Sequence, residues 1–159
     1  IKGSKSKSGI IVKGIHDLAV RFSKCCSPVP GDEIVGFVTR GRGITIHRTD
    51  CINVLNLPEI ERSRLIDAEW QGIEEDNSAA TYSTEISIFA NNRIGMFVDI
   101  SKIFTEREID IKTMNSRVNK QGKATITMSF DIHGIEELNN LMAKLRQIDG
   151  VLDIERTTG

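Results

Sequence analysis

The chain has 159 residues, of which 39% are hydrophobic and 27% charged, and its formal net charge is -1. This composition is that of an ordinary globular protein and excludes both a polybasic tail and an acidic disordered one. No segment approaches the roughly 18–20 apolar residues that span a bilayer, and the Lys/Ser/Gly-rich start lacks the apolar core of a secretory signal. Because the chain opens on Ile1 rather than Met, we expect a cytoplasmic fragment of a longer protein.

Charge and polarity predict two domains. Residues 1–56 carry a net charge of +5, and residues 57–159 carry -6. Between apolar segments, residues 71–80 are polar and show no periodicity, which is typical of a linker or exposed loop. We therefore expect a first domain over residues 10–70 and a second over residues 81–159.

The first domain is predicted to be small and rich in strands. Ile15, Leu18, Ala19 and Phe22 have helical spacing and predict a short helix that ends at Cys25-Cys26. After the breaks at Pro28 and Pro30 the pattern is that of strands. These expected elements are a strand at 34–38, a turn at 40–43, a returning hairpin strand at 44–47 and a third strand at 64–70.

The second domain has a more regular pattern. Alternating apolar residues predict strands, and apolar residues three or four apart predict helices. The expected elements are strands at 82–90, 109–118, 124–132 and 151–154, with helices around 96–104 and 138–145. The order βαββαβ is that of a ferredoxin-like unit. The predicted fold class is therefore α+β, with a small β-rich Cys/His domain followed by this unit.

All three cysteines gather near one histidine in the first domain. Cys25 and Cys26 are adjacent, and His47 precedes Cys51 by four residues. Thiolates and an imidazole suit tetrahedral zinc, and a domain of about 60 residues often needs such a metal. The alternative is a set of buried thiols packed as small hydrophobic groups. A Cys–His nucleophile is the weakest reading, because no recognised set of orienting groups accompanies it.

Two turns could bind ligands. Arg40 and Arg42 alternate with glycines in the hairpin turn, where arginines can contact phosphates, although a solvated turn is the simpler reading. The scarcity of aromatic residues, 5% of the chain, gives no support to base stacking of the kind used by RNA-recognition motifs. In the second domain, Gly95 in the turn 91–96 would let a carboxylate approach the start of the next helix, unless this is an ordinary strand–helix connection.

The first domain resembles the C-terminal region of long RelA/SpoT-family proteins, the (p)ppGpp synthetase/hydrolases of the bacterial stringent response. The resemblance rests on segments 22–32, 34–36, 39–43 and 46–51, which contain the Cys-Cys pair, the Arg-Gly-Arg-Gly turn and His-x3-Cys. The second domain resembles the ACT domain of those proteins. Together the similarity covers residues from about 10 to 158.

The resemblance implies a regulatory region without catalytic residues, whose parent protein is a GTP pyrophosphokinase, a (p)ppGpp hydrolase or both, with catalytic domains N-terminal to this region. It implies a zinc-finger-like domain with Cys25, Cys26, His47 and Cys51 as ligands. That domain is expected to dock on ribosomal RNA, with Lys24, Arg40, Arg42 and Arg48 as its phosphate contacts.

For the ACT domain, the resemblance implies a branched-chain amino acid as effector and a homodimer. The expected binding residues are those of the first strand–helix turn and one on the second strand: Asn92, Ile94, Gly95, Met96, Phe97 and Asn115. Asn92 stands where many ACT domains carry an acidic residue, so weak binding is expected. The alternative function is a stand-alone, dimeric amino-acid-binding ACT protein.

Overall fold

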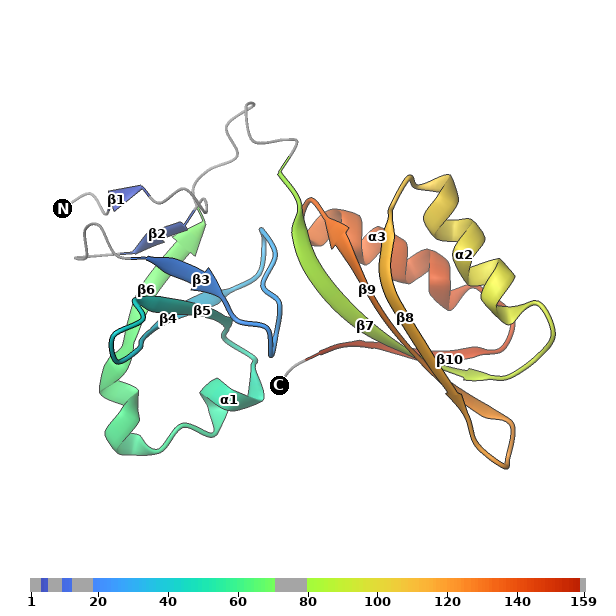
Figure 1. Cartoon of the computed structure of the whole chain (residues 1–159), viewed down its shortest axis with the longest axis horizontal. Helices are drawn as coiled ribbons and strands as arrows, with labels where there is room; N and C mark the ends of the chain where they lie inside the picture. Colours follow the sequence, from blue (N-terminus) through green and yellow to red (C-terminus); the bar gives the residue numbers. More distant parts are fainter. Residues whose placement is uncertain (1–3, 6–9, 13–18, 71–79, 158–159) are drawn as a thin grey trace. The chain divides into compact units, whose positions relative to one another are not determined.

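The structure, a computed structural model, describes residues 4–5, 10–12, 19–70 and 80–157. It divides into two compact units, one made of the residues up to Ala80 and the other spanning Thr81–Thr157 (Figure 1). Of the expected linker, residues 71–79 lie outside the described residues. Within the described parts, no helix is both long and apolar enough to cross a bilayer.

The first unit is built on a six-stranded sheet with the order β1-β2-β6-β4-β5-β3. Its elements are β1 (Ser4–Lys5), β2 (Ile10–Val12), β3 (Val20–Phe22), β4 (Ile34–Val38), β5 (Ile44–Arg48), α1 (Ile52–Leu55), the 3-10 helix η1 (Glu59–Arg64) and β6 (Leu65–Trp70). The hairpin of β4 and β5 and the strand β6 confirm the sequence prediction. The short helices α1 and η1 were not predicted.

The helix expected before Cys25 is wrong in its described part. Val20–Phe22 form strand β3, which pairs in parallel with β5 at the edge of the sheet. The Ala19 carbonyl accepts a hydrogen bond from the Ile44 amide at 2.9 Å, and the Phe22 ring stacks on Trp70 at 5.5 Å. These tertiary contacts override a helical spacing of only four residues. Ile15 and Leu18 lie outside the described residues.

Glycine is required where β3 approaches the β4–β5 turn. Gly43 has φ +81°, and a Cβ built on it would lie 2.2 Å from the Ala19 carbonyl oxygen. Gly41, at φ +80°, has open space around it. Gly43 thus permits the close approach that seats β3 against β5.

The two faces of this sheet differ. One face holds the apolar core of Ile10, Val12, Ile44 and Ile46. On the other face, Cys26, Cys51 and Val54 form a second buried cluster, packed against Val35 and Leu65. The cysteines therefore lie where a larger domain would bury apolar side chains.

The second unit is a four-stranded antiparallel sheet with the order β10-β7-β9-β8. Its elements are β7 (Tyr82–Asn91), α2 (Met96–Glu106), β8 (Ile111–Val118), β9 (Lys123–Ile132), α3 (Ile135–Arg146) and β10 (Val151–Arg156). Both helices cover one face of the sheet (Figure 1). This is the predicted βαββαβ fold.

Alternation along the central strands explains this arrangement. Ile86 and Ile88 on β7 and Ile126 and Met128 on β9 are fully buried on one face. The residues between them, such as Ser87 and its partner Thr127, form the opposite, polar face. Side chains alternate with a period of two, so one face serves as the core and the other stays accessible.

Candidate metal centre and binding surfaces

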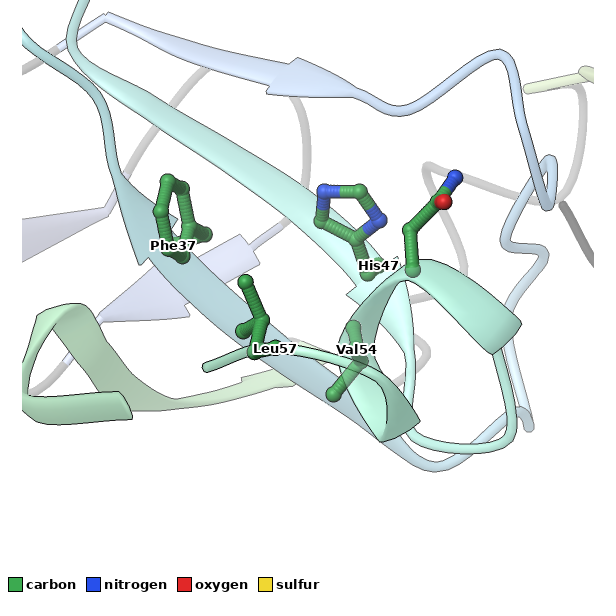
Figure 2. Close-up of a pocket in the computed structure, with 5 residues that line it drawn as sticks. Phe37, His47, Val54 and Leu57 are labelled. Carbon is green, nitrogen blue, oxygen red and sulfur yellow. The ribbon is translucent and has the colours of Figure 1, made fainter. Parts of the chain in front are cut away.

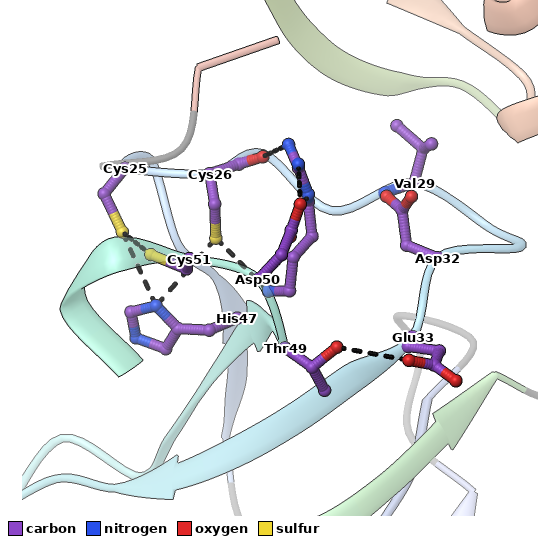
Figure 3. Close-up of polar contacts among 10 residues, drawn as sticks. Cys25, Cys26, Val29, Asp32, Glu33, His47, Thr49, Asp50 and Cys51 are labelled. Carbon is purple, nitrogen blue, oxygen red and sulfur yellow. Dashed lines mark hydrogen bonds and ion pairs between the residues drawn. The ribbon is translucent and has the colours of Figure 1, made fainter. Parts of the chain in front are cut away.

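Cys25, Cys26, His47 and Cys51 come together on one side of the first sheet, as Figure 3 shows. One ligand atom from each residue lies within 4.8 Å of all the others. Cys25 Sγ is 3.4 Å from Cys51 Sγ and 3.5 Å from His47 Nδ1, and Cys26 Sγ is 3.9 Å from the same nitrogen. This geometry confirms the prediction that the four residues lie together.

These distances fit a tetrahedral zinc site. Bonds of about 2.3 Å to sulfur and about 2.05 Å to nitrogen place the ligands of a tetrahedral ion roughly 3.8 Å (S···S) and 3.6 Å (S···N) apart. Three of the six separations, at 3.4 to 3.9 Å, bracket these values, and all six lie within 4.8 Å. Three thiols and one imidazole also form a typical structural zinc set. The cluster could therefore hold a metal ion.

A tight turn lets adjacent cysteines face one centre. The Ser27 amide donates to the Ser23 carbonyl at 3.0 Å, and Ser27 has φ +46°. His47 lies on β5. Cys51 is the N-cap of α1, and its backbone carbonyl accepts a hydrogen bond from the Leu55 amide at 3.0 Å. The site is thus assembled from a turn, a strand and a helix start.

Three further groups bond to the ligand sulfurs. The Arg48 amide donates to Cys26 Sγ at 3.3 Å, the Ser23 hydroxyl lies 2.7 Å from Cys25 Sγ, and Asn53 bonds to Cys25 through its side chain. Such outer partners orient ligands and stabilise thiolates. Sequence analysis missed Ser23 and Asn53; their only signal was a position two residues from a cysteine.

Burial and hydrogen bonding set the thiol and imidazole pKa values. Burial raises the pKa of Cys26 to about 12 and also raises the pKa of Cys51. Burial opposes ionisation of Cys25 too, but hydrogen bonds led by that from Ser23 bring its pKa below the ordinary value. Burial lowers the pKa of His47, which favours the neutral imidazole that a metal needs.

The prediction that Arg48 contacts RNA needs correction, because Arg48 is not exposed. The residue is only 5% exposed. Its guanidinium donates to the Cys26 carbonyl at 3.2 Å and to both Asp50 oxygens at 2.9 and 2.6 Å. Arg48 thus fixes the Cys-Cys turn to the start of α1, and the alternation along β5 could have indicated an inward position.

The other expected cations are exposed but do not form one tight cluster. Arg40 and Arg42 lie in the hairpin turn, at one end of β5, while Lys24 lies beside the cysteines near its other end. Arg21, which the sequence analysis did not select, is exposed on edge strand β3 between them, opposite Thr45. Cations therefore occur along this edge of the sheet.

The turn of the ACT-like unit is only partly available to a ligand. Ile94 is fully exposed and Gly95, at φ +84°, precedes α2, but the Met96 side chain is buried and its amide donates to the Arg93 carbonyl at 3.3 Å. Phe97 is 38% exposed, and Asn92 is exposed. The Met96 amide is therefore not one of the amides that can donate a hydrogen bond to a ligand carboxylate.

Asn115 is not beside this turn in the same chain. It pairs with Thr127 in the middle of β8, so it lies on the polar face of the sheet, whereas α2 covers the other face. Asn91, at the end of β7, pairs with Lys123, four residues along β9 from Thr127, or roughly 13 Å. Asn92 and Asn115 therefore do not lie side by side within one chain, and their grouping in a site between two copies stays a prediction.

Two family models match the chain in succession. A model described as the RelA/SpoT RIS domain matches residues 10–71, and an ACT domain model matches residues 78–156. The chain thus combines a RelA/SpoT RIS domain, which contains the Cys/His cluster, with an ACT domain. It belongs to the RelA/SpoT family and matches the C-terminal region of GTP pyrophosphokinases.

Curated relatives named GTP pyrophosphokinase match nearly the whole chain. The protein of Escherichia coli K12 is 36% identical over 157 residues, which are 98% of this chain and 21% of that protein. The Haemophilus influenzae protein is 35% identical, with 98% and 20% covered, and the Streptomyces coelicolor protein is 31% identical, with 94% and 17% covered. The chain spans about a fifth of the length of these relatives.

Among solved structures, the ACT domain from GTP pyrophosphokinase of Chlorobium tepidum is similar to this chain. The crystal structure is 26% identical with a TM-score of 0.44, and covers 48% of this chain and 99% of that one.

Proposed function

We propose that the chain is the non-catalytic regulatory part of a (p)ppGpp-metabolising GTP pyrophosphokinase, in which the RIS domain docks on ribosomal RNA and the ACT domain senses amino acids. The observation that carries the proposal is the closed Cys3His cluster in a RIS domain whose neighbouring edge carries exposed cations. Incubation of the chain with ATP and GDP or GTP is expected to give no (p)ppGpp, and turnover above a vector-only control would contradict this.

Cys25, Cys26, His47 and Cys51 would hold one zinc ion as a structural site with no position for water. The metal would supply the charge that lets buried thiols ionise and would tie the turn, β5 and α1 together. Support comes from the tetrahedral separations and the buried position of Cys26 and Cys51. Metal analysis of protein purified without chelator is expected to find about one zinc per chain.

RNA docking would use Arg40 and Arg42, with Lys24 as a weaker contact. Their exposure supports this role, whereas the buried Arg48 supports the fold instead. Replacing both hairpin arginines by glutamate is expected to weaken binding to ribosomes and to reduce its salt dependence by roughly one counterion for each lost contact. Unchanged ribosome binding by Arg40→Glu/Arg42→Glu would contradict the proposal.

The ACT domain would bind valine or isoleucine at its first turn. The free amides of the turn, at Ile94 and Gly95, would receive the carboxylate, Asn92 would accept a hydrogen bond from the ammonium group, and Phe97 would contact the aliphatic chain. Calorimetric titration with millimolar valine is expected to give heat that Asn92→Ala reduces. No heat, or equal binding by both proteins, would argue for a docking role alone.

The stand-alone dimeric alternative is favoured by one specific observation. β8 lies at the edge of its sheet, and Met114 and Val118 on it are 40% and 49% exposed. An exposed edge strand with apolar side chains is a template for pairing with a second copy. In such a dimer Asn115 would lie at the interface, and a mass measurement with and without valine tests this arrangement.

A further inference from the structure

The RIS domain has a small pocket beside the cysteine cluster, outside the set of expected RNA contacts. It is lined by Phe37, His47, Asn53, Val54 and Leu57 and has a volume of about 210 Å³. The pocket lies on the sheet face that also carries the cluster, between the strands and α1. Its walls are thus two rings, two aliphatic side chains and one amide.

Phe37 and His47 lie on opposite sides of the pocket, as Figure 2 shows, with Val54 and Leu57 below them. Phe37 pairs with Thr45 and Val35 pairs with His47, so Phe37 and His47 are diagonal neighbours on adjacent strands. The Cα atoms of such neighbours are roughly 7–8 Å apart. A planar ring stacked on Phe37 at about 3.5–4.0 Å would lie between the two side chains.

Polar groups at the pocket can recognise the edge of a planar ring. His47 Nδ1 faces the thiols, at 3.5 Å from Cys25 Sγ, so Nε2 points away from the cluster. When Nδ1 holds a metal, Nε2 keeps its proton and can only donate. Asn53 is exposed, and besides its bond to Cys25 its amide keeps a donor and an acceptor, which is the combination that reads the edges of unpaired bases.

One exposed cation lies near the pocket at a place suited to a phosphate. It is not Arg64, which lies over the Phe37 ring at 4.5 Å without lining the pocket and bonds to Glu61 and the Val38 carbonyl. Arg21, Thr45 and Phe37 are neighbours across three strands and share one face. Arg21 is therefore roughly 10 Å from Phe37, with its exposed side chain free to reach toward the pocket.

We propose that this pocket binds one unstacked base of an RNA strand against the Phe37 ring, with the Nε2 donor of His47 and the Asn53 amide at the opposite wall and Arg21 contacting the adjoining phosphate. The inference deepens the proposed RNA docking and rests on it. An aromatic side chain of a protein partner would fill the same space, but it would leave Arg21 and the Nε2 donor without a matching group. The combination of an aromatic wall, polar donors and a cation favours a nucleotide.

The direct test uses the zinc-supplemented 159-residue chain and AMP, GMP, CMP and UMP as probes in NMR titrations. We expect shifts confined to the pocket and Arg21, and a loss of affinity of about tenfold in Phe37→Leu, since stacking of one base has that scale. Phe22→Leu is the matched control, because Phe22 packs on Trp70 on the opposite face. Zinc content checks that Phe37→Leu and Phe22→Leu are folded.

Ribosome binding separates the failure of this site from the failure of docking. Phe37→Leu is expected to weaken binding without changing its salt dependence, whereas Arg21→Gln reduces the salt dependence by about one counterion. Nucleotides that shift the pocket of a chain that does not bind ribosomes would leave the base site standing and refute docking. Absence of pocket shifts with all four nucleotides, or equal affinity of Phe37→Leu and Phe22→Leu for ribosomes, would overturn the site.

Discussion

The two units of this chain stabilise their sheets in different ways. The ACT unit buries large side chains without polar partners, among them Phe104 and Phe130, whose rings meet edge-to-face at 5.0 Å. The RIS unit has one small apolar core and a second cluster in which Cys26 and Cys51 take the place of aliphatic residues. Where burial is limited by size, coordination chemistry can supply the missing stability.

The distribution of buried polar groups sharpens the contrast. Ser23 and Arg48 are buried in the RIS unit, and both bond to residues of the Cys-Cys turn. Among the described residues of the ACT unit, Thr84 is the buried polar side chain. Polar groups in the RIS unit are therefore concentrated around its candidate metal site, where they orient ligands.

The largest expected effect comes from removing the metal. A structural zinc contributes about 10–16 kcal/mol of binding free energy, as much as the whole unfolding free energy of a typical domain, about 5–15 kcal/mol. A strong chelator, or Cys51→Ser, is expected to abolish the thermal transition of the RIS unit and leave that of the ACT unit in place. Calorimetry with parallel zinc analysis measures both.

The packed-thiol reading makes the opposite prediction. If Cys51 is only a small buried hydrophobic group, chelator changes nothing, and the serine variant loses only the roughly 1–3 kcal/mol of a poorly satisfied buried hydroxyl. A stable metal-free RIS unit would therefore remove the contrast between the two units.

A core truncation should act only on the ACT unit. Phe130 is fully buried against Phe104, so Phe130→Ala is expected to lower the free energy of unfolding by about 3–5 kcal/mol. Denaturant titration of the ACT transition measures the loss, and zinc content should stay the same. A simultaneous loss of zinc would mean that the units are not energetically separate.

Sequence patterns predicted the ACT unit better than the RIS unit, for a physical reason. In β7 and β9 ten residues alternate, and α2 and α3 repeat their apolar positions over three turns, so local patterns agree with the packing. In the RIS unit, strand β3 has three residues and depends on distant β5. Its short segment carries too little pattern to outweigh that long-range pairing.

The candidate site also combines features that the sequence predicted with features that it did not. Chemistry alone grouped Cys25, Cys26, His47 and Cys51, because few other arrangements use these residue types together. The side-chain direction of Arg48 was predicted wrongly, because its charge suggested a surface position while the alternation along β5 turns it inward. Likewise, the low aromatic content gave no hint that Phe37 and His47 are diagonal neighbours, which only the strand register reveals.

Zinc affinity should rise steeply with pH. Burial raises the pKa values of Cys26 and Cys51, so both thiols are protonated near neutral pH and must release protons when a metal binds. His47, with its pKa lowered by burial, is already neutral and releases none. Each displaced proton changes affinity about tenfold per pH unit, so these two thiols alone predict at least roughly a hundredfold per unit between pH 6.5 and 8, to which Cys25 adds wherever it is still protonated. Competition with a chromophoric chelator measures the slope, and a flat profile would exclude thiolate ligation.

The smallest expected difference concerns one ion pair in each unit. Arg48 is 6% exposed in its side chain and binds Asp50 through two bonds, whereas Arg93 is 31% exposed and binds Asp99 through one, at 2.7 Å. Losing the partner of a buried guanidinium costs more than losing that of a solvated one. Asp50→Asn is thus expected to cost about 1.5–3 kcal/mol in the zinc-loaded RIS unit, and Asp99→Asn less than about 1 kcal/mol in the ACT unit. Arg93 also keeps its bond to the Asp149 carbonyl at 2.8 Å, which limits the stability lost in Asp99→Asn.

The free energy of unfolding of both variants at low and high salt measures this difference, and only the Asp99 contribution should decrease with salt. Equal losses would mean that burial does not set the strength of these pairs.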